Sequence, residues 1–225
     1  MENADGFACK LTAGTGNKFI GCRAWQNLDD GWDGYLRGTD NIETTYENCW
    51  AIKNGYLKNG TKGNGDGNGF KTGGSDDKLL KHHAIYKNCI AVGNVFDGFD
   101  HNSNRGKVTI YNCSAYDNGK NYSFSTSNPL EKLTIKNSNT LGAFGSINAT
   151  ILEVTNNSWQ NGISSTSEDF ESIDYNQLLN SRKADGSLPD VTFFHLKAGS
   201  DLIDKGVNVG LPFNGSAPDL GAFEY

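Results

Sequence analysis

The chain has 225 residues, of which 36% are hydrophobic, and it carries a formal net charge of −6 at pH 7. This acidic balance, without any block of Lys or Arg, argues against a nucleic-acid partner, and no apolar run approaches the roughly 18 residues of a membrane-spanning helix. The 28 glycines and only 4 prolines favour many short strands joined by turns over long helices.

The N-terminal segment, MENADGFACKL, contains no secretory signal peptide. A repeated motif begins directly within it, without a capping segment ahead of the first repeat. Because a stacked repeat fold needs a cap at its end, we expect the chain to lack its N-terminal coils and cap.

A turn residue followed by an aromatic residue recurs along the first half of the chain. The copies read DGFACK from Asp5, DGWDGY from Asp30, NGFKTG from Asn68, DGFDHN from Asp97 and YSFSTS from Tyr122. In this alignment the turn residues are Gly6, Gly31, Gly69, Gly98 and Ser123, and the aromatic residues are Phe7, Trp32, Phe70, Phe99 and Phe124. Such self-similarity predicts a solenoid.

A second repeated pattern follows the first in each unit. Its columns are Gly21, Asn48, Asn88, Asn112, Asn137 and Asn156; then Cys22, Cys49, Cys89, Cys113, Ser138 and Asn157; then Ala24, Ala51, Ala91, Ala115 and Thr140; then Trp25, Ile52, Val92, Tyr116 and Leu141; and finally Asn27, Asn54, Asn94 and Asn118. Like residues stack on like when successive coils lie about 4.8 Å apart. The aromatic, Cys, Ala and aliphatic columns are expected to fill the interior, with Asn at the corners.

These columns predict an all-β fold, a single-stranded parallel β-helix. The cysteines fit a column of buried thiols better than disulfides or metal ligands. The coils and the catalytic site are expected in residues 1–160. The columns fade after about Leu152, and residues 161–225 are expected to form an extension that packs on the β-helix and holds a short helix within 172–186.

Two columns break the rule of like on like. The position before the turn residue reads Asp5, Asp30, Asn68, Asp97 and Tyr122. The position two after the turn residue reads Ala8, Asp33, Lys71, Asp100 and Ser125. The register also brings together four carboxylates, those of Asp5, Asp29, Asp30 and Asp33. Carboxylates held this close repel one another unless a cation neutralises them, and oxygen ligands without His or Cys favour calcium. The alternative is that these Asp-Gly pairs are ordinary turns with solvated carboxylates.

Lys71 lies in the column of Asp33, one coil further on. Beside a metal ion, its pKa would fall toward the range of a useful base. The alternative is an exposed lysine in an ordinary salt bridge. The loop before it, NGYLKNGTKGNGDGNG, is an insertion that serves either as a lid or sugar-binding loop or as a flexible excursion.

Several residues near the same turns are candidates for binding substrate. Basic side chains at this edge could hold sugar carboxylates, and a histidine in the fourth copy could reach the cleft together with the residue after it. The candidates are Lys10, Arg37, His101, Asn102 and Arg105.

Taken in order, ADGFACKL, LDDGWDGY, NGFKTGG and FDGFDHNSN closely resemble family 9 polysaccharide lyases, over about residues 3–140. The resemblance implies a right-handed parallel β-helix with calcium ligands at Asp5, Asp29, Asp30 and Asp33. It places the Brønsted base at Lys71. It also implies a bacterial secreted or periplasmic enzyme, for which we expect a monomer, whose partner is an acidic plant cell-wall polysaccharide, pectate or rhamnogalacturonan.

The implied reaction is a calcium-dependent β-elimination, in which neutral Lys71 removes the C5 proton of a uronate and the C4–O bond breaks. Two other functions stay open. A β-helix hydrolase would use a pair of carboxylates as acid and base, but the expected His and Arg-Lys motifs are absent. A carbohydrate-binding solenoid with structural calcium would bind polysaccharide without forming a product.

Overall fold

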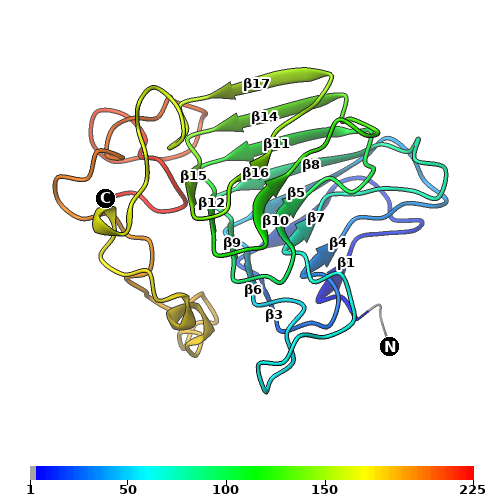
Figure 1. Ribbon diagram of the computed structural model, residues 1–225, viewed down its shortest axis with the longest axis horizontal. Helices are drawn as coiled ribbons and strands as arrows, with labels where there is room; N and C mark the ends of the chain where they lie inside the picture. Colours follow the sequence, from blue (N-terminus) through cyan, green and yellow to red (C-terminus); the bar gives the residue numbers. More distant parts are fainter. Residues whose placement is uncertain (1–3) are drawn as a thin grey trace.

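The computed structural model describes residues 4–225 and shows a parallel β-helix with a C-terminal segment along one side (Figure 1). Asn3, where the family resemblance begins, and the other residues of the 1–3 stretch lie outside the described part. Within residues 4–225 the strands form two six-stranded sheets and one five-stranded sheet, all parallel. The predicted fold class is confirmed.

Each of the first five coils contributes one strand to each sheet, and the sixth contributes one strand to sheet 1 and one to sheet 2. Sheet 1 contains β1 (Phe7–Ala8), β4 (Trp32–Asp33), β7 (Phe70–Lys71), β10 (Asp97–Asp100), β13 (Lys120–Ser123) and β16 (Gly145–Ser146). Sheet 2 contains β2 (Asn17–Ile20), β5 (Ile42–Glu47), β8 (His82–Lys87), β11 (Lys107–Tyr111), β14 (Lys132–Lys136) and β17 (Ile151–Thr155). Sheet 3 contains β3 (Arg23–Trp25), β6 (Trp50–Ile52), β9 (Ile90–Val92), β12 (Ser114–Tyr116) and β15 (Asn139–Leu141).

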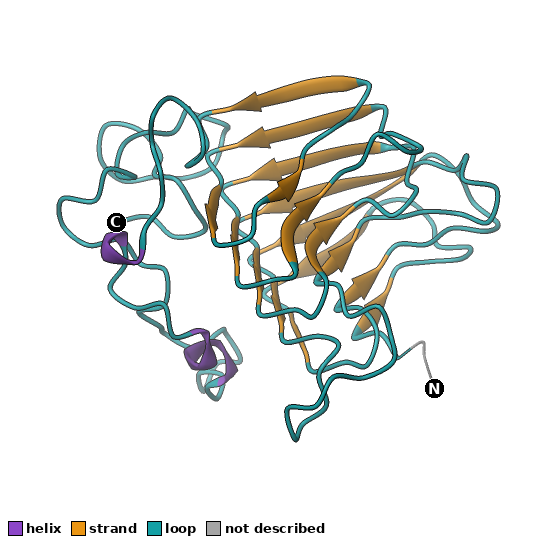
Figure 2. Cartoon of the chain, in the orientation of Figure 1, coloured by secondary structure: helices purple, strands orange, loops and turns teal. Residues whose placement is uncertain are grey.

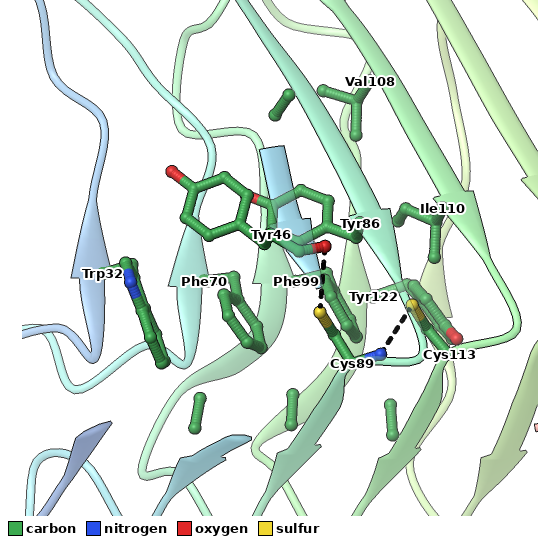
Figure 3. Packing of buried hydrophobic residues seen from close by; sticks show 14 of the residues in the cluster. Trp32, Tyr46, Phe70, Tyr86, Cys89, Phe99, Val108, Ile110, Cys113 and Tyr122 are labelled. Carbon is green, nitrogen blue, oxygen red and sulfur yellow. Dashed lines mark hydrogen bonds between the residues drawn. The ribbon is translucent and has the colours of Figure 1, made fainter. Parts of the chain in front are cut away.

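Aromatic rings from the first five strands of sheet 1 stack through the interior, and Figure 3 shows four of them, Trp32, Phe70, Phe99 and Tyr122. The ring of Trp32 lies parallel to that of Phe70 with centroids 4.7 Å apart, and Phe70 stacks on Phe99 at 5.1 Å. A second stack from sheet 2, including Tyr46 and Tyr86 at 4.6 Å, meets the first edge-on. Because each ring packs on its equivalent one coil away, the sequence repeats at this position.

The register expected for the fifth coil is wrong by two residues. Tyr122, not Phe124, stacks on Phe99 with ring centroids 5.6 Å apart, and Ser123, not Ser125, pairs with Asp100. Ser123 is therefore no turn residue. Tyr122 lies in β13 and Phe124 directly follows that strand; two residues apart, they point to the same side and both are fully buried, so a pattern of aromatic residues fits either alignment.

The corners carry two sets of asparagines. Those in the first set, such as Asn48 and Asn88, adopt a left-handed backbone with φ of 51°. In the second set, Asn54 Nδ2 donates to Asn94 Oδ1 at 2.8 Å, and Asn94 Nδ2 donates to Asn118 Oδ1 at 2.7 Å. These buried ladders satisfy amide groups that would otherwise be costly to bury. All five cysteines are free, as expected.

The aliphatic column of sheet 3 does not fill the interior, contrary to expectation. Alanines such as Ala51 face inward, and the alternate positions, including Ile52 and Val92, face outward into a second apolar cluster. The C-terminal segment covers them with residues such as Phe193 and Leu202. Strand alternation decides this, because neighbouring residues of one strand point to opposite faces.

The C-terminal segment contains two 3-10 helices, η1 (Ser167–Asp169) and η2 (Tyr175–Leu179), drawn in purple in Figure 2. η2 lies within the stretch where a short helix was expected. Arg23 of β3 anchors this end of the segment by donating from Nη1 to the backbone oxygens of Leu178 at 2.6 Å and Asn180 at 2.7 Å. In the part of the chain that the structure describes, no helix has the length and apolar character to cross a membrane.

Candidate active site

The outward-facing positions of sheet 1 form a mixed column. Asp33 of β4 pairs directly with Lys71 of β7, and Lys71 pairs in turn with Asp100 of β10. Ala8 and Ser123 continue the column at either end. Since paired positions in a parallel sheet lie about 4.8 Å apart, the register sets Lys71 between two carboxylates.

A second column of side chains lies at the turn before sheet 1. Backbone N–H groups of the next coil hold these side chains in place. Asp5 Oδ1 accepts from the backbone N–H of Asp30 at 3.3 Å. Asp30 Oδ1 accepts from the backbone N–H and from Nδ2 of Asn68, at 3.0 and 2.9 Å. Asn68 Oδ1 accepts from the N–H of Asp97 at 3.0 Å. One oxygen of Asp30 is therefore occupied by the fold, and Oδ2 is left for other partners.

Lys71 reaches from its strand onto this second column. Its Nζ lies 3.0 Å from Asp30 Oδ2 and 3.5 Å from Asp66 Oδ2. The Lys71 side chain is 12% exposed and that of Asp30 is fully buried. No donor is well aligned with the buried Asp30 Oδ2, and its charged partner is the ammonium of Lys71.

Lys10 binds the other side of the cluster. Its Nζ donates to Asp5 Oδ2 at 2.6 Å and to Asp33 Oδ2 at 2.9 Å. Both carboxylates are nearly buried, at 4% and 6% side-chain exposure. An ammonium group thus lies between two carboxylates that come from different coils.

Burial and charge shift the protonation of these groups in opposite directions. Burial raises the pKa of the Asp30 carboxyl to about 7, although Lys71 counteracts part of this. Burial also raises the pKa of Asp29. Burial alone lowers the pKa of Lys71, but the surrounding carboxylates, Asp30 first among them, outweigh it and hold that pKa above its ordinary value. The nearby carboxylates therefore hold Lys71 in its ammonium form.

The carboxylates form two groups of suitable size for one cation each. The first contains Asp5, Asp30 and Asp33, and the second contains Asp29, Asp30 and Asp66; in each, one oxygen from every residue lies within 4.8 Å of the others. Asp30 belongs to both groups, and its Oδ2 is the one buried carboxylate oxygen without an aligned donor among residues 4–225. Oxygen ligands of this kind fit calcium.

Asp66 is the residue that sequence reasoning missed. It lies in the inserted loop, and its backbone N–H donates to Asp29 Oδ1 at 2.8 Å. The loop folds back across the turn, so that Gly65 packs against the backbone of Leu28 and Asp29. No other coil has an equivalent segment, so no column could have placed Asp66. The sequence marks Asp66 only by the glycine that follows it, as at the other Asp-Gly turns.

A pocket of about 370 Å³ opens beside Lys71. Lys10, Asp33, Tyr35 and Arg37 contribute to its lining. Arg37 Nε donates to Asp76 Oδ2 at 3.0 Å, and the hydroxyl of Tyr35 donates to Asp76 Oδ1 at 2.8 Å. A shared carboxylate therefore orients the phenol and the guanidinium at the mouth of the pocket.

The remaining substrate-binding candidates lie outside this lining. His101 is buried, and its ring nitrogens face the backbone oxygens of Ser123 and Ser127, each at 3.3 Å. Asn102 donates from Nδ2 to the backbone oxygen of Gly73 at 3.2 Å. Arg105 lines a separate pocket with Lys81 and Glu131 among others. The structure thus brings Lys10 and Arg37 to Lys71 but leaves these three apart from the pocket.

Comparison with known proteins gives consistent relatives. A family model described as "Pel9A-like, right handed beta helix region" matches residues 1–148. Pectate lyase L of Dickeya dadantii is 41% identical over 98% of this chain and 51% of its own length. The crystal structure of pectate lyase Pel9A superposes with a TM-score of 0.89 at 38% identity, covering 99% of this chain and 55% of that one.

A further solved structure, titled rhamnogalacturonan lyase, has a TM-score of 0.76 at 31% identity and covers 87% of this chain and 52% of that one. The chain therefore spans about half the length of the proteins that it resembles.

Proposed function

Because the chain belongs to the Pel9A-like family of right-handed β-helices, we propose that it is the catalytic β-helix of a calcium-dependent lyase that cleaves pectate by β-elimination. The observation that carries the proposal is the ion pair of Lys71 with the buried Asp30, at the edge of a pocket lined by Lys10 and Arg37. The basic side chains at this pocket can bind an acidic sugar, and the carboxylate cluster beside them can bind a cation.

The calcium ligands in this proposal are Asp5, Asp29, Asp30 and Asp33, and Asp66 is a further candidate. When bound, calcium would supply positive charge that offsets the carboxylates and acidifies the proton next to a uronate carboxylate. The fold contributes by holding Asp30 and Asp5 through backbone N–H donors. These carboxylates are positioned before any ligand arrives, which lowers the cost of assembling the site.

Lys71 is the proposed base. The Lys71 side chain is largely buried but contributes to the lining of the pocket, so Nζ can accept the C5 proton of a uronate bound there. The electron pair of that C–H bond forms the C4–C5 double bond, the C4–O bond breaks, and the leaving oxygen takes up a proton as a hydroxyl. No water is consumed. Lys71 must be neutral to act, so activity should rise with pH.

Substrate binding is assigned first to the residues that line the pocket. Arg37, oriented by Asp76, presents a guanidinium for a sugar carboxylate next to the reacting unit. Lys10 can serve the same purpose once its contacts with Asp5 and Asp33 are relaxed. His101, Asn102 and Arg105 stay candidates for more distant sugars. We place the enzyme outside the bacterial cytoplasm, as a monomer, where a cell-wall polymer is accessible.

Rhamnogalacturonan is the second candidate substrate, and the resemblance to a solved rhamnogalacturonan lyase favours it. The two backbones share a uronate as the unit that loses its proton, so the same base and cation would serve both. They differ in the neighbouring sugar, which is rhamnose in one and galacturonate in the other. The residues at the pocket mouth therefore decide between them.

The test is an absorbance assay for the conjugated double bond, run on both polymers with calcium or with EDTA, across about pH 7–10. We expect calcium-dependent product, an alkaline rise in rate, and a loss of about 10²–10⁴-fold in Lys71→Ala. Lys18→Ala, an exposed lysine on sheet 2, is the matched control and should keep full activity.

Other results would identify the alternatives. New reducing ends without the double bond would point to a hydrolase. Polysaccharide binding without any product, unchanged by Lys71→Ala, would point to a binding solenoid. If Lys71→Ala kept more than about a tenth of the activity, the assignment of the base would be wrong.

A further inference from the structure

A second pocket, of about 430 Å³, lies at the corner that follows sheet 3. The corner positions after successive strands of that sheet, Gln26, Lys53, Gly93 and Asp117, form one side of it. None of its lining residues also lines the pocket beside Lys71. The two pockets thus have separate linings, although the connections from sheet 3 to sheet 1 that line this pocket also carry Asp30 and Asp66 of the candidate active site.

The C-terminal segment supplies one aromatic wall of this pocket. The ring of Tyr175, from η2, packs against Gly93, where any side chain would meet ring atoms at 3.1–3.2 Å. Its hydroxyl donates to Asp117 Oδ2 at 3.0 Å, and Lys53 Nζ lies 5.2 Å from the ring centroid. Lys53 also donates to Asn176 Oδ1 at 2.7 Å. Contacts to several coils therefore hold the ring in place.

The inserted loop supplies the opposite wall. Tyr56 and Lys62 form an antiparallel bridge, and the backbone N–H of Leu57 donates to Thr61 at 2.8 Å, so the loop tip is a tight turn. The half-buried Tyr56 and the exposed Lys58 face the pocket from this turn. The same loop contributes Asp66 to the carboxylate cluster, and so it connects the two sites.

The charges in this pocket favour an anion. Within residues 4–225, neither Lys53 nor Lys58 forms an ion pair, although the chain as a whole has a net charge of −6. Asp117, the one acidic residue of the lining, is bound by the hydroxyl of Tyr175. Two ammonium groups and two tyrosine rings in one lining offer charge for carboxylates and flat apolar faces for sugar rings.

We propose that this pocket is a second, non-catalytic binding site for an acidic oligosaccharide. Tyr56 and Tyr175 would contact the sugar rings, and Lys53 and Lys58 would bind the uronate carboxylates. The choice of a uronate over other sugar acids rests on the proposed function. A polymer bound at this pocket stays close to Lys71, because one loop contributes to both sites. The effective concentration of the polymer at Lys71 would therefore rise.

The experiment uses the full chain carrying Lys71→Ala, in EDTA, so that neither catalysis nor calcium contributes to binding. Trigalacturonate is titrated into this ¹⁵N-labelled protein, and we expect amide shifts at Lys58, Gly60 and Gly93. Tyr56→Ala should weaken this binding by about tenfold or more, and so should Lys58→Glu, which changes an exposed side chain and leaves the packing intact. Lys62→Glu, the matched change in the same loop but outside the pocket, should retain binding within about twofold.

Several outcomes would overturn the proposal. Binding that persists in both pocket variants, or shifts confined to the surroundings of Lys71, would exclude the pocket. Equal binding of neutral galactotriose would exclude recognition of uronate, and full competition by inorganic phosphate at equal concentration would reduce the pocket to a simple anion site.

The two proposals fail separately. Pocket binding without lyase activity in the wild-type chain would contradict only the proposed reaction. Lyase activity in the wild-type chain without pocket binding would contradict only this second site.

Discussion

Sheet 1 presents two faces with opposite rules. On its inner face, Trp32, Phe70 and Phe99 stack ring on ring, so each coil repeats the last. On its outer face, the very next residues, Asp33 and Lys71 among them, differ from coil to coil. Packing between identical coils selects like residues inside, whereas chemistry needs unlike residues side by side outside. In this solenoid the repeat marks the core, and the breaks in the repeat mark the candidate site.

The sharpest test of this contrast uses the adjacent residues of β7. Lys71→Arg keeps a positive charge beside Asp30. The guanidinium of arginine stays protonated at about pH 7–10, so it cannot accept the C5 proton of the substrate. We expect activity to fall by about 10²–10⁴-fold, with the free energy of unfolding changed by less than about 1 kcal/mol. Kinetics and urea titration of the same preparation measure both. A variant that was active and unstable would reverse the roles of the two faces.

Phe70→Ala changes the residue just before it and should have the opposite effect. The lost ring leaves a cavity between Trp32 and Phe99, so we expect the free energy of unfolding to fall by about 3–5 kcal/mol. Phe213→Ala, at 36% exposure, is the control and should change it by about 0.5 kcal/mol or less. Equal effects of the two substitutions, in urea titrations, would show that the aromatic stack does not dominate the core.

Asp100 tests the cost of placing a carboxylate on the outer face. Burial raises its pKa from 3.8 to about 7. The folded state then holds this proton more tightly than the unfolded chain, so the stability it contributes is fully present below about pH 4 and is lost as the pH rises through about 7. Asn stays neutral throughout, so Asp100→Asn should flatten that decline.

We expect the difference in unfolding free energy between Asp100→Asn and the wild type to grow by about 1–4 kcal/mol from pH 4 to pH 8. Urea titrations at a series of pH values in EDTA measure it. Parallel pH profiles for the two proteins would mean that Asp100 titrates alike in the folded and unfolded states.

The smallest expected effect concerns Lys10, whose ammonium bridges Asp5 and Asp33. If these carboxylates bind calcium, Lys10 competes with the ion, so Lys10→Ala should raise the calcium affinity by about tenfold. Lys18→Ala, which removes an equal charge from an exposed site, should change it by less than about twofold. Calorimetric titration of calcium measures both, and an unchanged or lower affinity in Lys10→Ala would place the ion away from Asp5 and Asp33.

The sequence could place the coils because each packed column appears in it as a spaced repeat. It could not align the fifth coil, since Tyr122 and Phe124 are both buried and both aromatic. It also placed the column of Ile52 and Val92 inside, because an apolar column covered by another segment looks like one that faces the core. Composition alone does not distinguish the two.

The sequence by itself determined the β-helix, its asparagine ladders and the register that sets Lys71 beside Asp33. Like residues stack at a fixed spacing, so the contacts between coils are written along the chain. Only the tertiary structure decided that Asp66 joins the carboxylates, that Lys10 lies between Asp5 and Asp33, and that Tyr175 completes a second pocket. These contacts come from a loop, a turn and a C-terminal segment without counterparts in other coils, so no periodicity constrains them.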